Sequence, residues 1–222
     1  MICVMGDTHG DYSRFSHKAL KRLKKGDYLI ICGDFGFVWD GSEKEWSVLK
    51  KIGAKKYTTL FLTGGHDNTS LLEQYPECEL FGGRGRHICG NLYMLSSGEI
   101  FNVDGASVFA FGGGQSADSA DEAESAADEE LFDEACLEAA RNRLSEHGGR
   151  VDYIFTHEPP GSIAEFLTMN DPRRINMGQL NIFFDRLKES AEFKMWFFGK
   201  LHKNKSVPSR YMAVFDEPYF IE

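Results

Sequence analysis

The feature that most restricts the fold is the alternation of short apolar runs with amphipathic stretches in the first third of the chain. The predicted elements are, in order, a strand at 2–5, a helix at 14–25, a strand at 27–32, a helix at 42–52 and a strand at 58–63. Ser42 is suited to cap the second of these helices. Because strands and helices alternate, we expect parallel strands joined by helical crossovers.

Shorter apolar segments indicate further strands in the rest of the chain. Strands are predicted at 91–95, 98–103, 106–114, 152–157 and 193–199, a helix near 177–189, and a closing hairpin at 211–221. Asp104–Gly105 is typical of a tight hairpin turn. Arg84 and Arg86 fall on a predicted surface loop at 81–87. Because no linker separates two cores, residues 1–222 are predicted to form a single α/β domain.

The segment 116–149 differs in composition from the rest of the chain. Its first half is rich in Ala, Asp, Glu and Ser and has almost no large apolar residue. Its second half has helical spacing and ends at Gly148–Gly149. We favour an acidic insertion that forms a solvated loop and leads into an amphipathic helix. The alternative is a mobile acidic lid beside a functional site.

Charge and composition exclude several classes of protein. The formal net charge is −9, which disfavours strong nucleic-acid binding because that binding relies on cationic groups that neutralise phosphates. No apolar run approaches the roughly 18 residues that a membrane-spanning helix needs, and the first residues lack the basic leader of a signal peptide. Five scattered cysteines without a CxxC pair indicate free thiols in a reducing compartment. We therefore expect a soluble, cytoplasmic protein without a membrane partner.

Residues of metal-ligand types stand at the ends of the predicted strands. They are Asp7 and His9, then Asp34, then His66, then His157, and finally His202, which Lys200 precedes by two residues. In an open α/β sheet the carboxyl ends of parallel strands meet in one crevice, so these side chains are expected to converge. A mixture of carboxylates and imidazoles suits Mn²⁺, Fe or Zn²⁺ better than Ca²⁺. The sequence therefore predicts a site for a divalent transition-metal ion.

The order of these motifs resembles that of the calcineurin-like metallophosphoesterases. The matching stretches are GDTHG at 6–10, GD at 33–34, GGHD at 64–67, the histidine at 157 and GKLH at 199–202. The resemblance covers nearly the whole chain and looks closest to small bacterial and phage-type members. It implies a four-layer α/β/β/α sandwich, in which two mixed sheets are flanked by helices. In that family a dinuclear site activates water for in-line attack on a phosphoester.

The resemblance also implies a role for each site residue. By motif position, the ligands of the first metal ion would be Asp7, His9 and His202. Asp34 would bridge to a second ion, which His157 would also bind. His66 would protonate the leaving oxygen or contact the phosphate. The activity implied is hydrolysis of a phosphoester by metal-activated water.

Two departures from the family pattern fall on the same ion. Gly65 stands where the family usually has asparagine, and Lys200 stands where it usually has histidine. We therefore expect one tight divalent ion, Mn²⁺ before Fe or Zn²⁺, and an incomplete second site. Lys200 would supply positive charge beside Asp34 and bind a phosphate oxygen. The alternative is a drifted lysine that points to solvent.

A third departure concerns the residue that orients the site histidine. Phe37 stands where many members place an aspartate, and either Asp67 or Asp40 would compensate for it. The candidate catalytic residues are therefore His66, Lys200 and Asp67.

These expectations favour a metal-dependent phosphoesterase. The alternative is a catalytically silent module that binds metal or phosphate and acts through a partner. The substrate-selecting loops carry no readable code, so monoesters, diesters and nucleotide-like substrates all stay open, as does the oligomeric state.

Overall fold

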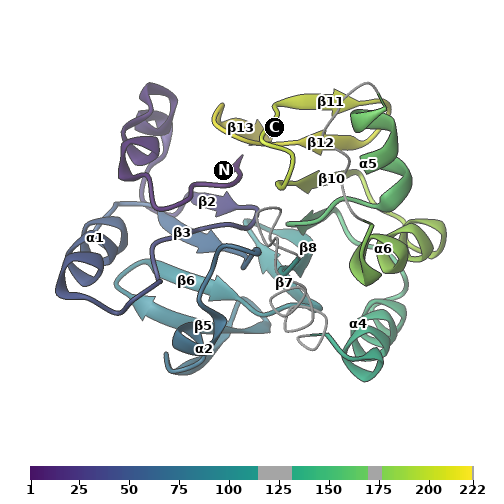
Figure 1. Ribbon diagram of the computed structural model, residues 1–222, viewed down its shortest axis with the longest axis horizontal. Helices are drawn as coiled ribbons and strands as arrows, with labels where there is room; N and C mark the ends of the chain where they lie inside the picture. The colour runs from purple at the N-terminus through teal and green to yellow at the C-terminus, as the bar shows by residue number, and fades with distance from the viewer. Residues whose placement is uncertain (115–131, 170–176, 222) are drawn as a thin grey trace.

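Two mixed β-sheets form the centre of the molecule, which the computed structural model describes over residues 1–114, 132–169 and 177–221 (Figure 1). The first sheet has seven strands in the order β13 (Tyr219–Ile221), β1 (Ile2–Met5), β2 (Tyr28–Ile31), β3 (Thr58–Phe61), β6 (Leu92–Leu95), β5 (Gly83–Cys89) and β4 (Glu77–Leu80). The second has six strands in the order β11 (Lys205–Val207), β12 (Tyr211–Ala213), β10 (Met195–Phe198), β9 (Tyr153–Thr156), β8 (Ala106–Phe111) and β7 (Glu99–Val103).

Helices flank the two sheets on opposite sides. The described α-helices are α1 (Glu43–Gly53), α2 (Thr69–Leu72), α4 (Glu134–Glu146), α5 (Gly161–Thr168) and α6 (Gln179–Ser190). Figure 1 shows α1 on one side of the sheets and α4, α5 and α6 on the other. Among the described residues, no helix combines the length and apolar character that crossing a membrane requires.

The alternation of side chains along the strands produces three hydrophobic cores. In β1, Cys3 and Met5 face the core that contains Ile52 of α1, whereas Ile2 and Val4 face a core shared with the second sheet. On the far face of the second sheet, Trp196 and Phe198 pack with residues of α4, α5 and α6. Three cores between successive layers confirm the predicted four-layer α/β/β/α sandwich with two mixed sheets.

Parallel pairing aligns the strand ends that carry the candidate ligands. In the first sheet, Met5, Ile31 and Phe61 are register partners on β1, β2 and β3. In the second sheet, Phe111, Thr156 and Phe198 are register partners on β8, β9 and β10. The loops after these strands therefore leave each sheet at the same edge, as the predicted crossover pattern requires.

Several local predictions are confirmed by the structure. Ser42 caps α1, since its hydroxyl oxygen accepts a hydrogen bond from Glu45 N at 3.3 Å. Asp104 and Gly105 adopt positive φ angles of 55° and 79° at the β7–β8 hairpin, which fits a type I′ turn. Helices α4 and α6 lie where amphipathic helices were expected. The acidic stretch at 115–131, predicted as a loop or a lid, lies outside the described residues.

The predicted helix at 14–25 is wrong, because this segment forms two separate 3-10 turns, η1 (Tyr12–Ser16) and η2 (Lys18–Arg22). His17 interrupts them with an extended backbone of φ −55° and ψ 134°. Its ring nitrogen Nδ1 then caps η2 by accepting from Ala19 N at 3.3 Å. The apolar residues that suggested a helix are still buried, since Phe15 and Leu20 lie in the core beside α1.

Two further predictions, a closing hairpin and a surface loop, are wrong because these segments pair as strands with other partners. The expected closing hairpin at 211–221 is wrong: β12 pairs with β10 in the second sheet, whereas β13 pairs with β1 in the first. The loop expected at 81–87 is largely strand β5, which forms an antiparallel hairpin with β4. On β5, Arg86 is half-buried and pairs with Glu77 at 2.9 Å.

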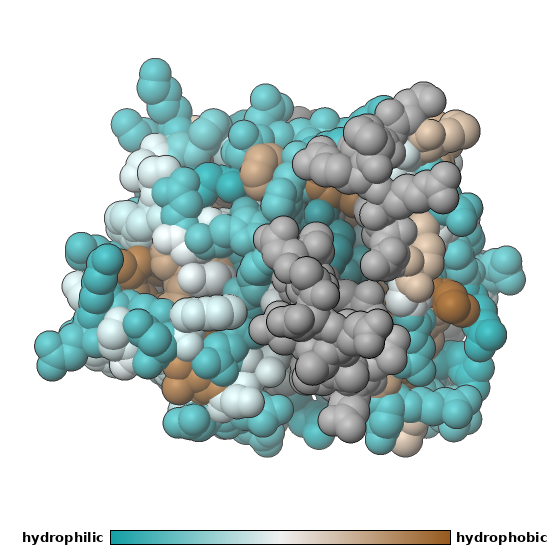
Figure 2. Space-filling model, in the orientation of Figure 1, coloured by the Kyte–Doolittle hydropathy of each residue, from teal (hydrophilic) through white to brown (hydrophobic). Residues whose placement is uncertain are grey.

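Polar residues dominate the face of the molecule drawn in Figure 2, where hydrophobic residues lie in separate small patches. Trp39 on the loop before α1 is exposed, as are Phe166 on α5 and Ile182 on α6. Scattered exposed apolar side chains of this kind are ordinary on a protein surface.

Candidate metal centre

The loops that follow β1, β2 and β10 bring four residues of metal-ligand type together. One ligand atom from each of Asp7, His9, Asp34 and His202 lies within 4.8 Å of the ligand atoms of the other three. The Nε2 atoms of His9 and His202 are 2.9 Å apart, and His9 Nε2 is 3.6 Å from Asp34 Oδ2. This is the group that the sequence predicted as the first-metal ligands together with the bridging aspartate.

The backbone of this region is held in an unusual conformation. Seven non-glycine residues have positive φ angles among those described, and five of them belong to the site: Asp7, His9, Asp34, Lys200 and His202. Left-handed conformations of this kind are uncommon for non-glycine residues and cost of order 1–3 kcal/mol each. Such strain persists only where the surrounding structure enforces it, and it clusters at functional sites.

Asp7 supplies the clearest test of whether the site suits a cation. Its side chain is fully buried, and Oδ1 accepts a hydrogen bond from Lys200 N at 2.9 Å. Its other oxygen, Oδ2, has no hydrogen-bond partner among the described residues. Burial and the neighbouring Asp34 carboxylate raise the pKa of Asp7 well above its ordinary value. A buried, unpaired carboxylate oxygen beside two imidazoles is the environment that a divalent cation would satisfy.

The two histidines of the group are suited to bind metal as neutral imidazoles. Burial is the largest effect that lowers the pKa of both His9 and His202. His202 also stacks on Phe215, with ring centroids 5.0 Å apart. Sequence reasoning missed Arg14, which supports this arrangement by donating hydrogen bonds to the backbone oxygens of Gly6 at 2.9 Å and Asp7 at 3.2 Å.

Asp34 lies at the centre of the histidine cluster. Its Oδ2 atom is 3.1 Å from His66 Nδ1, and its Oδ1 atom is 3.6 Å from His157 Nε2. Burial raises the pKa of Asp34, but the adjacent His157 and His66 outweigh burial and hold that pKa below its ordinary value. The two oxygens of Asp34 thus face His9 on one side and His157 on the other, and the bridging role implied by the resemblance stays a prediction.

His157 is placed as the sequence predicted but is more deeply buried than the other site histidines. Its side chain is inaccessible to solvent, and Nδ1 lies 3.3 Å from the carbonyl oxygen of Cys32. Its Nε2 atom has no hydrogen-bond partner among the described residues. If Nδ1 donates to the carbonyl, the Nε2 lone pair is directed toward Asp34, which leaves part of a second cation site in place.

His66 stands at the rim of the site. Its backbone N donates to Asp34 Oδ1 at 2.9 Å, so backbone and ring both contact the same carboxylate. The loop can approach this closely because Gly64 has no side chain: a Cβ atom there would lie 2.1 Å from Asp34 Oδ1. Among the described residues, the carboxylate beside the His66 ring is thus Asp34, whereas Asp67 and Asp40 were the expected candidates.

Asp67 joins the two loops that carry Asp34 and His66. Its carboxylate accepts hydrogen bonds from three backbone N–H groups: Phe35 at 3.1 Å, Gly36 at 2.7 Å and Gly64 at 2.9 Å. Burial raises the pKa of Asp67 to about 7, although these donors act in the opposite direction. Asp40 lies outside the site, where it accepts from Ser42 N before α1. Both Asp67 oxygens are therefore engaged in holding the loops in place.

Lys200 points into the protein rather than to solvent. Its ammonium nitrogen is 2.9 Å from Oε1 of Glu158, and the side chains are 10% and 5% exposed respectively. Sequence reasoning missed Glu158, although its place directly after His157 at a strand end was a usable signal. The drifted, solvent-facing lysine considered from sequence does not describe this geometry.

Gly33 allows His157 to approach the β2 loop, and its replacement tests this contact. Gly33 has a φ of 81°, and a Cβ atom there would lie 2.1 Å from His157 Nδ1. Gly26 has a φ of 90° with nothing within 4 Å. We expect Gly33→Ala to lower the free energy of unfolding by about 2–4 kcal/mol, and Gly26→Ala by about 1 kcal/mol from backbone strain alone. Equal losses in urea denaturation would show that His157 does not constrain this position.

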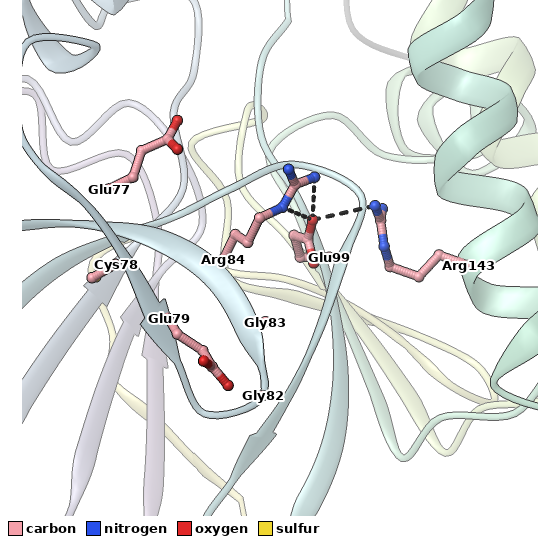
Figure 3. A pocket seen from close by; sticks show the side chains of 8 residues that line it. All are labelled: Glu77, Cys78, Glu79, Gly82, Gly83, Arg84, Glu99 and Arg143. Atoms are coloured by element: carbon pink, nitrogen blue, oxygen red, sulfur yellow. Dashed lines mark hydrogen bonds and ion pairs between the residues drawn. The ribbon is translucent and has the colours of Figure 1, made fainter.

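A second cluster of charged residues lies away from the metal centre, between the β4–β5 hairpin, β7 and α4. It lines a cavity of about 530 Å³. Figure 3 shows Arg84 and Arg143 directed at Glu99, which they contact at 2.8 Å and 3.3 Å. Glu99 is buried and its charge is paired, and no histidine is among the residues that line the cavity. This cluster therefore lacks the ligand set of the metal centre.

One comparison with known proteins agrees with the site geometry. The family model described as calcineurin-like phosphoesterase matches residues 1–204. No match is found among curated proteins. Among solved structures, the chain is similar to a protein of unknown function from Aquifex aeolicus, with 13% identity, 87% of each chain covered and a TM-score of 0.37. A TM-score at that level supports no argument about this chain.

Proposed function

The chain belongs to the calcineurin-like phosphoesterase family, and from this premise we propose that it hydrolyses a phosphate mono- or diester with the help of a divalent metal ion. The observation that carries the proposal is the fully buried Asp7, which lies beside His9 and His202. Its Oδ2 atom has no hydrogen-bond partner among the described residues. Such an atom is costly to bury unless a cation satisfies it.

Four residues would hold the ion: Asp7, His9, Asp34 and His202. Their mixed oxygen and nitrogen donors favour Mn²⁺, with Fe and Zn²⁺ as alternatives. When bound, a divalent ion supplies Lewis acidity and an activated water molecule at neutral pH. His157 and Asp34 would retain part of a second site, which we propose is weak or empty because Gly65 and Lys200 replace its remaining ligands.

The residues around the ion have distinct proposed roles. His66 lies at the rim with its ring against Asp34, where it would donate a proton to the leaving oxygen or hydrogen-bond to the phosphate. Lys200 would supply fixed positive charge toward the phosphate on the side of the incomplete second site. Asp67 holds the loops of Asp34 and His66 through backbone hydrogen bonds, so it would act on the geometry of both.

The substrate we propose is a small phosphoester or a nucleotide-like molecule. The formal net charge of −9 disfavours long nucleic acids as partners. A second candidate function is a catalytically silent module that binds metal or phosphate, and Gly65 and Lys200 favour it because they remove second-ion ligands.

Metal analysis combined with activity assays separates the two functions. The purified protein is analysed for bound metals and assayed on generic phosphomonoesters and phosphodiesters with Mn²⁺, Fe²⁺ and Zn²⁺. Turnover that depends on the ion and disappears with chelator supports the phosphoesterase. Tight metal binding without turnover under any of these ions supports the silent module.

We predict about one tight divalent ion per chain, whereas a complete two-metal site would bind about two. Gly65→Asn and Lys200→His together should recruit a second ion beside His157 and raise activity on simple phosphoesters. Because Lys200 pairs with Glu158, the restored protein also carries Glu158→Gln to avoid a lone buried carboxylate. Elemental analysis of the triple variant, with Glu158→Gln alone as control, checks the stoichiometry. Two tightly bound ions in the native protein would contradict this prediction.

A further inference from the structure

Glu158 is a buried carboxylate that the proposed reaction does not use directly. It follows His157 at the end of β9, and its side chain is 5% exposed. Its Oε1 atom lies 2.9 Å from the ammonium nitrogen of Lys200, at the end of the neighbouring strand β10. The ion pair therefore connects two adjacent strand ends at the edge of the sheet where the metal centre lies.

The surroundings hold Glu158 at both its backbone and its carboxylate. Asn181, a buried residue in the first turn of α6, donates to Glu158 Oε2 at 3.3 Å and to the carbonyl oxygen of Pro159 at 2.9 Å. The hydroxyl of Thr156 donates to the Glu158 carbonyl oxygen at 2.6 Å, and Trp196 Nε1 donates to that hydroxyl at 2.9 Å. The carboxylate thus has little freedom to move.

Lys200 is likewise held at both ends. Its backbone has a φ of 66° and donates to Asp7 Oδ1 at 2.9 Å. Its ammonium group pairs with Glu158, and the Lys200 side chain is 10% exposed. A lysine carries about 2 kcal/mol of rotamer entropy in solution, so an ammonium group has a defined position only if the protein supplies a partner. Among the described residues, Glu158 is a partner of this ammonium group at 2.9 Å.

A third loop packs closely against the Glu158–Lys200 ion pair. Gly114, after β8, has a φ of 149°, and a Cβ atom there would lie 2.5 Å from Glu158 Oε1. The pair is therefore enclosed by the ends of β8, β9 and β10 and by the start of α6. The pair is connected to the metal centre in two ways: the Lys200 backbone N donates to Asp7 Oδ1, and Glu158 directly follows His157 in the chain.

We propose that Glu158 is the positioning residue for Lys200, holding its ammonium group beside the metal centre on the side where the second ion's ligands are missing. This inference rests on the proposed function, because it assumes that the Lys200 ammonium group interacts with the phosphate of the substrate. Glu158 itself does not contact the substrate and acts only through Lys200.

A cycle of variants tests this dependence: Lys200→Met, Glu158→Ala, and both together. If Glu158 acts through Lys200, each single variant should lower kcat by about 10²-fold, the order found when one fixed charge-stabilising group is removed. The double variant should be no slower than Lys200→Met alone. Glu158→Gln should stay within a few-fold of the native protein, because a carboxamide oxygen can still accept from the ammonium group.

A matched control separates positioning from general loss of stability. Glu99 is also a buried, paired carboxylate, but it lies in the Arg84–Arg143 cluster away from the site. Glu158→Ala should lower Tm by roughly 10 °C, because it leaves the buried Lys200 ammonium group without this partner. Glu99→Ala should also lower Tm, but by less, because its partners Arg84 and Arg143 are 71% and 33% exposed. Only Glu158→Ala should lower kcat. Equal effects of both variants on kcat would overturn the proposal.

The same cycle can be measured without turnover. Binding of inorganic phosphate to the Mn²⁺-loaded protein is measured by calorimetry for the native chain and for all variants. Lys200→Met and Glu158→Ala should weaken phosphate binding equally, and the double variant should be no weaker than either. If the variants show this pattern of phosphate binding but the native chain does not hydrolyse phosphoesters, the phosphoesterase proposal fails and the Glu158 proposal stands. Native phosphate affinity in Glu158→Ala, or additive losses in the double variant, would overturn the Glu158 proposal.

Discussion

Asp7→Ala should abolish tight binding of the divalent ion, and His202→Ala should have the same effect. Asp7 contributes a buried oxygen atom without a hydrogen-bond partner among the described residues, and His202 contributes an imidazole 2.9 Å from that of His9. Loss of an outer-shell partner alone typically reduces metal affinity 10–100-fold, so loss of a direct ligand should cost at least about 10²-fold. Titration with Mn²⁺ after chelation and elemental analysis of the purified variants measure the effect.

The control for this prediction is a carboxylate nearby in the chain but outside the group. Asp11 caps η1, where its Oδ1 atom accepts from Ser13 N at 2.9 Å. Asp11→Ala should keep the native metal affinity. Circular dichroism should show that Asp7→Ala and His202→Ala still fold. Native affinity in both of these variants would refute the assignment of the metal centre.

His66→Asn should lower turnover by about 10²–10⁴-fold while metal binding and the fold stay intact. The range is that expected when a positioned group that transfers a proton is removed. Asparagine can still hydrogen-bond to Asp34, whose Oδ2 atom lies 3.1 Å from His66 Nδ1, so the geometry around the ion should change little. Steady-state kinetics on a phosphomonoester and a phosphodiester, together with Mn²⁺ titration, measure the two effects separately.

A histidine on a strand of the first sheet provides the comparison. His87 lies on β5, where Nε2 is 3.1 Å from the carbonyl oxygen of Gly90. His87→Asn should leave kcat unchanged. If His66→Asn instead reduces stability and keeps native turnover, His66 has a structural role and the proposed proton transfer is wrong.

The two predictions address different parts of the proposed function. Loss of metal in Asp7→Ala tests the ligand set, and it applies equally to an enzyme and to a silent metal-binding module. Loss of turnover in His66→Asn applies to an enzyme only. A chain that needs Asp7 for metal but shows no turnover with native His66 would therefore be the module.

Short-range patterns are enough to predict the α/β class of the fold and most of the candidate ligand group. Apolar runs of strand length alternate with helical spacing in the first third, and parallel pairing follows from the helical crossovers between them. Polar residues placed just after such strands must meet at one sheet edge. Asp7, His9 and Asp34 follow strands of the first sheet and converge in this way, whereas His202 follows β10 of the second sheet, so its place beside them also requires the two sheets to pack face to face.

Other features depend on contacts between elements, which local patterns do not reveal. The segment at 14–25 has helical spacing, yet an extended His17 divides it into two short turns that fill the space beside α1. Residues 219–221 leave their sequence neighbours and pair with β1 of the other sheet. Apolar spacing shows only which side chains are buried, whereas the competition among strands for edges depends on the whole fold.

The partner of Lys200 is the clearest example at the site itself. Its place in the motif identified it as unusual, but nothing local indicates a glutamate 42 residues earlier as its counter-ion. Only the parallel pairing of β9 with β10 makes these two strand ends neighbours. A buried ammonium group needs a carboxylate within reach, and its identity depends on which strands lie side by side, a long-range property that sequence patterns do not contain.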